Sequence, residues 1–149
     1  MLALKIEQRD VKQFMNKLLI DGVFDFFEFR EAHISSFIRF ELDGQKAPGP
    51  DGAHAAWKEV KPYAFNILRG SRKPKFMRFV LSYPEGRVAE LDPGARALFL
   101  NIIFEEESVR VTTGFSAEKF RLDKAPESKW EAYVRGFLMD SGVVFEEQG

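Results

Sequence analysis

Residues 23–42 constrain this chain most, because they combine a dense aromatic content with a clear two-residue repeat. The segment reads VFDFFEFREAHISSFIRFEL and holds six of the sixteen phenylalanines. From residue 32 onward, small or apolar side chains alternate with mostly polar ones, which is typical of a strand with one buried and one wet face. The polar members are His33, Ser35, Arg39 and Glu41. Just before residue 32 the apolar register is odd instead, at Phe27 and Phe29, so we predict one long strand with a β-bulge near residues 30–32.

Two other stretches repeat with the period of an α-helix. The first has apolar residues on one helical face at Val11, Phe14, Met15, Leu18 and Leu19. It predicts a helix over residues 11–21 that begins at an Asp10–Gln13 capping box and ends at a left-handed Gly22. The second predicts a helix over residues 129–141, which begins at a Ser128–Glu131 capping box and ends at Gly142. Each helix has an apolar stripe that needs a sheet to cover.

The remaining periodic segments are short and favour strands. Alternation predicts strands at residues 2–6, 76–83 and 109–113, with a further short strand at 143–145. Residues 97–104 are apolar on both faces, which indicates a central strand. Pro62 predicts the first turn of a short helix, and residues 45–56 predict an exposed loop rich in Gly and Pro. The chain therefore predicts a single two-layer α+β domain over residues 1–149, with a mostly antiparallel sheet of four or more strands covered by two helices.

Composition excludes several classes of function. The chain has no cysteine, which excludes disulfides, thiolate metal sites and cysteine nucleophiles and fits a cytoplasmic protein. The longest strongly apolar run is much shorter than the roughly 20 residues that cross a membrane, so we expect no membrane association. A net charge of -1 gives no global reason to expect nucleic acid.

Several short segments resemble a family of short bacterial conserved-hypothetical proteins, which is defined as a domain of unknown function. The likeness begins with the opening MLALKI and with Val11-Lys12 and FMNKLL over residues 14–19. It continues at Phe24-Asp25, Glu31-Ala32, Ile34, Asp43-Gly44, Trp57, Gly70 and Pro74. The resemblance implies no reaction, cofactor or partner.

One segment, residues 69–78, carries an excess of positive charge. It reads RGSRKPKFMR, and its cations are Arg69, Arg72, Lys73, Lys75 and Arg78. Such a basic turn predicts contacts with phosphate oxygens of an anionic ligand or of nucleic acid. The alternative is a solvated turn whose charges pair with the acidic residues 105–107 or with the acids near the C-terminus.

The two histidines are the other candidates for chemistry. His33 shares a strand face with Glu31 and Glu41, which is a possible acid–base arrangement. His54 follows Asp51 in the predicted loop, and a metal there would need further ligands. No nucleophile elbow, Walker loop or dinucleotide-binding motif is present, so we predict no cofactor and no metal.

These observations leave three hypotheses. The first is a non-enzymatic binding or interaction module that acts on itself or on a protein partner, through a sheet edge or an aromatic surface. The second is a nucleic-acid or anionic-ligand binder that uses the basic turn. The third is a small enzyme centred on His33 and the nearby carboxylates.

Overall fold

A computed structural model describes residues 1–46, 53–69, 73–117 and 125–148. Within these residues, the strands form one antiparallel sheet in the order β3-β2-β4-β5-β6-β1-β7. The strands are β1 (Ala3–Ile6), β2 (Glu28–Ser35), β3 (Arg39–Asp43), β4 (Phe76–Ser82), β5 (Ala95–Glu105), β6 (Ser108–Ala117) and β7 (Glu146–Glu147). The helices are α1 (Gln8–Leu19), α2 (Trp57–Arg69), α3 (Val88–Leu91) and α4 (Ala125–Asp140), with a short 3-10 turn η1 (Glu85–Arg87).

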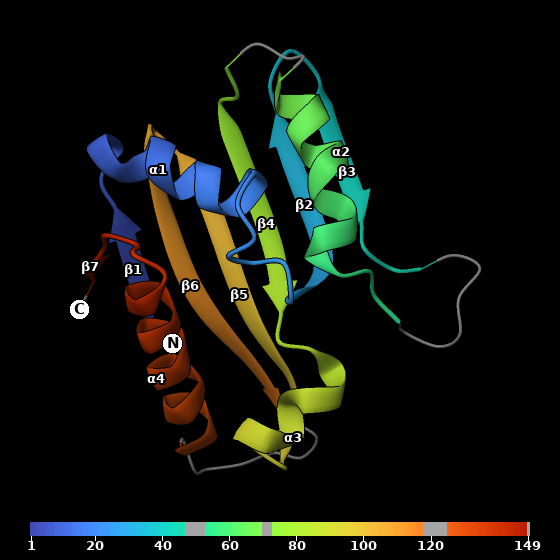
Figure 1. Ribbon diagram of the computed structural model, residues 1–149, viewed down its shortest axis with the longest axis vertical. Helices are drawn as coiled ribbons and strands as arrows, with labels where there is room; N and C mark the ends of the chain where they lie inside the picture. The colour runs from blue at the N-terminus through green and yellow to red at the C-terminus, as the bar shows by residue number, and fades with distance from the viewer. Residues whose placement is uncertain (47–52, 70–72, 118–124, 149) are drawn as a thin grey trace.

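The molecule has two layers, as predicted. Figure 1 shows α1, α2 and α4 on the same side of the sheet. Because the central position belongs to β5, the prediction of a buried central strand is confirmed. The third long helix, α2, was predicted only as a short one, and Pro62 lies inside it rather than in its first turn. None of the helices in the described part of the chain is long and apolar enough to cross a membrane.

The phenylalanine-rich segment is not one strand, so that prediction is wrong. Residues 23–27 form turns, and a three-residue turn at 36–38 then separates β2 from the antiparallel β3. The pairs run from Glu31 with Asp43 to Ser35 with Arg39, so even residues still pair with even ones. The hairpin therefore keeps the same alternation that one long strand would show. The predicted slip near residue 30 is real, since the register of β2 against β4 shifts between Phe29 and Glu31.

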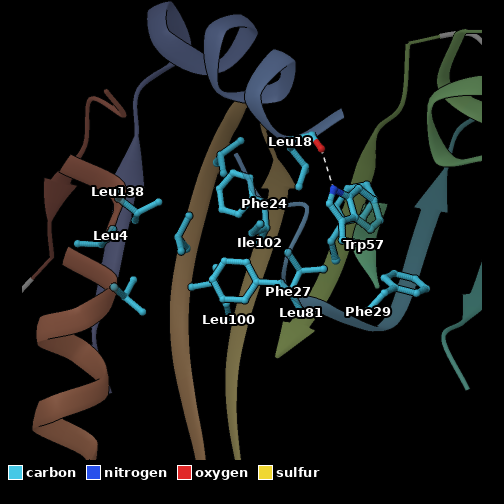
Figure 2. Packing of buried hydrophobic residues seen from close by; sticks show 14 of the residues in the cluster. Leu4, Leu18, Phe24, Phe27, Phe29, Trp57, Leu81, Leu100, Ile102 and Leu138 are labelled. Atoms are coloured by element: carbon cyan, nitrogen blue, oxygen red, sulfur yellow. Dashed lines mark hydrogen bonds between the residues drawn. The ribbon is translucent and has the colours of Figure 1, made fainter. Parts of the chain in front are cut away.

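The core lies between the helices and one face of the sheet. Figure 2 shows Phe24, Phe27 and Phe29 inside it, and all three are buried. The three long helices contribute large side chains, which are Phe14 and Leu18 from α1, Trp57 from α2, and Trp130, Val134 and Leu138 from α4. Phe37, in contrast, is exposed at the tip of the β2–β3 hairpin. The aromatic content of the segment therefore divides between core and surface.

Helix α1 begins and ends differently from the prediction. It begins at Gln8, so Asp10 lies in its first turn, and the residue that precedes it makes no side-chain cap. At its end, the indole nitrogen of Trp57 donates to the Leu18 carbonyl at 2.7 Å, and Lys61 Nζ donates to the Asp21 carbonyl at 3.0 Å (Figure 2 shows the indole contact). The last carbonyls of a helix lack intrahelical donors. Side chains of α2 therefore donate to the carbonyls at this helix end, where we predicted a left-handed Gly22 to end the helix.

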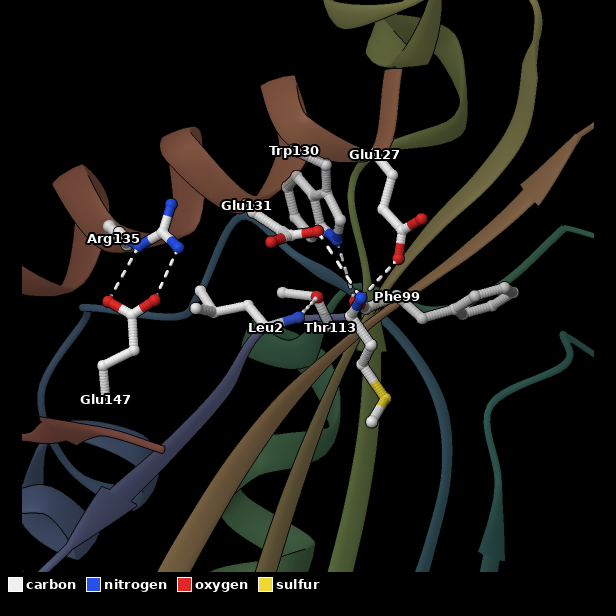
Figure 3. Close-up of polar contacts among 9 residues, drawn as sticks. Leu2, Phe99, Thr113, Glu127, Trp130, Glu131, Arg135 and Glu147 are labelled. Carbon is white, nitrogen blue, oxygen red and sulfur yellow. Dashed lines mark hydrogen bonds and ion pairs between the residues drawn. The ribbon is translucent and has the colours of Figure 1, made fainter. Parts of the chain in front are cut away.

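Helix α4 is held against β5, β7 and the N-terminal amine of the chain by the polar contacts that Figure 3 draws. Arg135 donates to both carboxylate oxygens of Glu147, at 3.1 and 2.6 Å, and Trp130 Nε1 donates to the Phe99 carbonyl at 3.0 Å. The helix begins at Ala125, so the predicted Ser128 capping box is wrong, whereas Gly142 follows it at a φ of +77° as expected. The last strand lies at Glu146–Glu147 rather than at 143–145.

Candidate functional site

The face of the sheet that turns away from the helices is the candidate site, and we call it the open face. On the helix side, one row across the strands consists of core residues, namely Ala32, Phe79, Ile102, Val111 and Leu4. Because neighbouring residues along a strand point to opposite faces, the adjacent row faces away from the core. That row runs Glu41, His33, Arg78, Ile103, Arg110, Lys5 and Glu146 from β3 to β7. Polar and charged side chains thus dominate the open face.

A shallow recess of about 320 Å³ lies on the open face over β2, β3 and β4. We call it the arginine recess, and its lining is His33, Ser35, Arg39, Phe76 and Arg78. The sheet register brings these residues together, because Ser35 lies opposite Arg39 on one side and Phe76 on the other, while His33 lies opposite Arg78. Two guanidinium groups, an imidazole, a hydroxyl and an aromatic ring therefore share one concavity.

Two glutamates balance the charge of the arginine recess. Arg39 pairs with Glu41 at 2.7 Å, and Arg78 pairs with Glu31 at 3.3 Å. His33 lies between these two carboxylates, with each of its ring nitrogens 3.6 Å from one of them. The side chain of Arg39 is 66% exposed and that of Arg78 is 39% exposed, so solvent screens both pairs. Each pair therefore contributes little to stability.

The residues of the basic turn do not form one cluster in the described part of the chain. Arg69 is exposed at the end of α2, and Lys73, which precedes β4, pairs at 2.9 Å with Glu107 of the β5–β6 turn. Lys75 is exposed, and Arg72 lies outside the described residues. Of the described members, Arg78 is the one that lines the arginine recess. The alternative in which the turn pairs with the acids at 105–107 therefore holds for Lys73.

The two histidines differ in their surroundings. His33 is half-buried in the arginine recess, but within the described residues no hydrogen bond joins it to Ser35, and the recess is open. His54 pairs with Gln45 in an isolated bridge at the base of the loop, and Asp51 lies outside the described residues. No group of three or more potential metal ligands occurs in the part of the chain that the structure describes.

A second concavity of about 390 Å³ runs along α4, between Ala132 and Ser141. Tyr133 and Phe137 line it, and the Phe137 ring also packs edge-on against Phe26 at 5.6 Å. Burial raises the pKa of the Tyr133 hydroxyl, and the neighbouring Tyr83 adds to the effect. These contacts make the groove an extension of the aromatic core, and it holds fewer charged groups than the arginine recess.

A family model matches residues 17–146, and its description is "Family of unknown function (DUF5721)". The chain belongs to this family. The matched segment includes β2, β3, α2 and β4, and therefore every strand that forms the arginine recess, but it begins after the opening segment at residues 1–6 that also carried the resemblance. No similar curated protein was found, and no similar solved structure was found.

The sequence alone placed three of the five lining residues of the arginine recess on one face. Alternation placed His33, Ser35 and Arg39 on one polar face, which is where they lie. It did not connect them with Phe76 and Arg78, which are more than thirty positions away along the chain. Alternation within residues 76–83 already separated Phe76 and Arg78 from the buried Met77 and Phe79, but local spacing does not show that this strand pairs with β2.

Proposed function

We propose that this domain is a non-enzymatic binding module and that the arginine recess receives the anionic group of a small ligand. The observation that carries the proposal is the register of three strands, which gathers Arg39 and Arg78 around His33 and beside Phe76. The proposed anion site therefore lies on the sheet and not in the basic turn. Of the residues in the basic turn it includes Arg78, and its other donors are Arg39 and His33.

The donors of the recess suit a phosphate or carboxylate. Arginine offers several N–H donors in a planar fork, and its bonds to an oxyanion are stronger than those between neutral groups. The exposed pair of Arg39 with Glu41 has a small net stability, so an entering anion replaces it at little cost. A protonated His33 would add a third donor between the two arginines.

Phe76 and the size of the recess narrow the ligand class. The ring of Phe76 gives the recess an apolar wall next to the cations. A volume of about 320 Å³ corresponds to the small end of the ligand pockets found in proteins. A small aromatic or otherwise flat phosphate or carboxylate therefore matches both the charge and the shape of this site.

Charge on the open face argues against an extended nucleic acid. Its cations Arg39, Arg78, Arg110 and Lys5 are accompanied by the carboxylates of Glu31, Glu41, Asp43, Glu105 and Glu146. A polyanion needs an excess of positive charge over many contacts, whereas one small anion needs only a local pair of donors. The open setting of His33 likewise favours binding over catalysis, and the lack of cysteine fits a reducing compartment such as the cytoplasm.

A titration with phenyl phosphate, followed by NMR, tests the proposal. We expect chemical-shift changes centred on His33, Ser35 and Phe76, and we expect R39Q and R78Q each to weaken binding by about tenfold or more. The matched control is R9Q, because Arg9 is an exposed arginine of α1 that also pairs with a neighbouring carboxylate. The proposal fails if millimolar phenyl phosphate leaves the recess unperturbed, or if R9Q weakens binding as much as R39Q does.

Two further compounds separate the contribution of the charged groups from that of the Phe76 ring. Inorganic phosphate lacks a ring, so F76A is expected to weaken the binding of phenyl phosphate and to leave the binding of inorganic phosphate unchanged. Benzyl alcohol lacks the charge, so it is expected not to compete. Equal loss of both anions in F76A would show that the ring is only structural.

A further inference from the structure

In the part of the chain that the structure describes, no strand pairs with the outer edge of β3. β3 is the last strand of the sheet, and among the described residues β2 is the one strand that pairs with it. The Ser36 amide donates to the Ile38 carbonyl at 3.0 Å, and the Gly44 amide donates to the Arg30 carbonyl at 2.8 Å. Even-numbered residues of β3 therefore bond inward to β2, and the amides and carbonyls of Arg39, Glu41 and Asp43 point outward.

This edge differs from the opposite one. β7 has two residues, and the Arg135–Glu147 pair holds it to α4, so it offers little backbone for a partner. β3 has five residues, with no proline and no lysine. At the hairpin tip beside it, Phe37 is 57% exposed and Ile38 is 52% exposed. An edge with free backbone and adjacent apolar side chains pairs readily.

The charge order of β3 is complementary to itself in antiparallel orientation. We propose that two copies of this chain associate through their β3 strands, with the two-fold axis at Phe40. In that register Arg39 lies opposite the second copy's Glu41 on both sides of the axis, and Phe40 faces its counterpart. Exposed Ile38 then lies opposite the half-buried Leu42, so that both gain apolar contact.

Other registers are worse because they juxtapose like charges. An axis at Glu41 puts the two Glu41 carboxylates opposite each other, and an axis at Leu42 puts Glu41 opposite Asp43. The register at Phe40 also joins outward-facing residues with outward-facing residues, as an antiparallel ladder requires. Its two hydrogen-bonded pairs, each of Arg39 with Glu41, exchange two N–H···O bonds apiece.

Charge exchange between β3 strands tests this dimer. The variant R39E places Glu opposite Glu at both pairs, and E41R places Arg opposite Arg, so each alone is expected to weaken self-association by about tenfold or more. An equimolar mixture of the two variants restores two opposite-charge pairs and is expected to form a heterodimer. The double variant R39E/E41R is expected to dimerise like the native chain.

Sedimentation equilibrium of the full chain reads out the mass, which is 17.1 kDa for one copy. Thermal unfolding of each variant shows whether it is folded, and the mixture and double variant separate lost pairing from lost folding. Native chain that remains monomeric up to about 1 mM overturns the inference, since a dimer with a dissociation constant of that order would then be populated. So does a mixture of R39E and E41R that stays monomeric. The R78Q comparison tests the arginine recess separately from this dimer, because Arg78 lies on β4, away from the β3 edge, and R78Q leaves Arg39 and Glu41 unchanged.

Discussion

Replacing Trp57 by phenylalanine tests whether a side chain of α2 stabilises the C-terminal end of α1. Trp57 is fully buried, and its indole nitrogen donates to the Leu18 carbonyl at 2.7 Å. That carbonyl belongs to the last turn of α1, so it has no donor within the helix. W57F removes the donor while keeping an aromatic ring beside Phe29 and Phe79.

The expected loss of stability has two parts. A buried acceptor left without a partner costs about 1–3 kcal/mol. The smaller ring also buries less apolar area, which costs about 1 kcal/mol. The free energy of unfolding should therefore fall by about 2–4 kcal/mol, and Tm should fall by roughly 5–15 °C for a domain of this size.

Urea unfolding followed by circular dichroism measures the change, because the signal does not depend on the indole that is lost. F79L is the matched control, since it removes buried apolar area next to Trp57 without leaving a polar group unpaired. Hydrogen exchange separates the two variants further. Ile20 and Asp21 amides, which both donate to the Asn16 carbonyl, should lose protection in W57F and keep it in F79L. A loss below about 0.5 kcal/mol in W57F, or unchanged protection at Ile20, would refute the reasoning.

Two further predictions concern the turn between β5 and β6 and the pair that holds β7. Glu106 and Glu107 have φ angles of 53° and 64°, which Asn and Gly adopt with less strain. The double variant E106N/E107G should therefore raise the free energy of unfolding by about 1 kcal/mol in urea unfolding. The strain energy that it relieves exceeds the energy of the two exposed contacts that Glu107 makes. A decrease would mean that those contacts outweigh the strain. Hydrogen bonds from Arg135 lower the pKa of the Glu147 carboxyl below its ordinary value of 4.5, so the pair stabilises β7 above that pH and the effect is lost as the pH falls through the lowered pKa. In R135Q the pKa of Glu147 should return toward 4.5 in a carboxyl NMR titration, and an identical titration curve in both chains would contradict this assignment.

Local periodicity in the sequence predicted most of the secondary structure. The apolar face of α1, the central position of β5 and the returning arm in β6 all follow from residue spacing alone. The same periodicity failed at residues 23–42 for a specific reason. A three-residue turn leaves even residues opposite even residues, so a hairpin and a single strand have the same alternation. Local spacing carries no information that distinguishes the two.

Helix ends were predicted less well, because their partners come from other elements. Asp10 and Ser128 have the chemistry of N-caps, yet both lie inside helices that begin earlier. The carbonyls at the end of α1 are satisfied by Trp57 and Lys61, some forty positions away along the chain. A capping motif shows only which hydrogen bonds a residue can make to its own helix. Packing against a neighbouring helix decides which donor reaches the free carbonyls at the helix end.

The sequence by itself determined that a polar strand face containing His33, Ser35 and Arg39 would lie opposite a buried apolar face, because successive side chains of a strand point to opposite sides. Only the tertiary structure decided that β4 pairs with β2, and hence that Arg78 and Phe76 complete the arginine recess. Strand order depends on how three helices cover one continuous apolar surface, and this is a property of the whole chain that no short segment encodes.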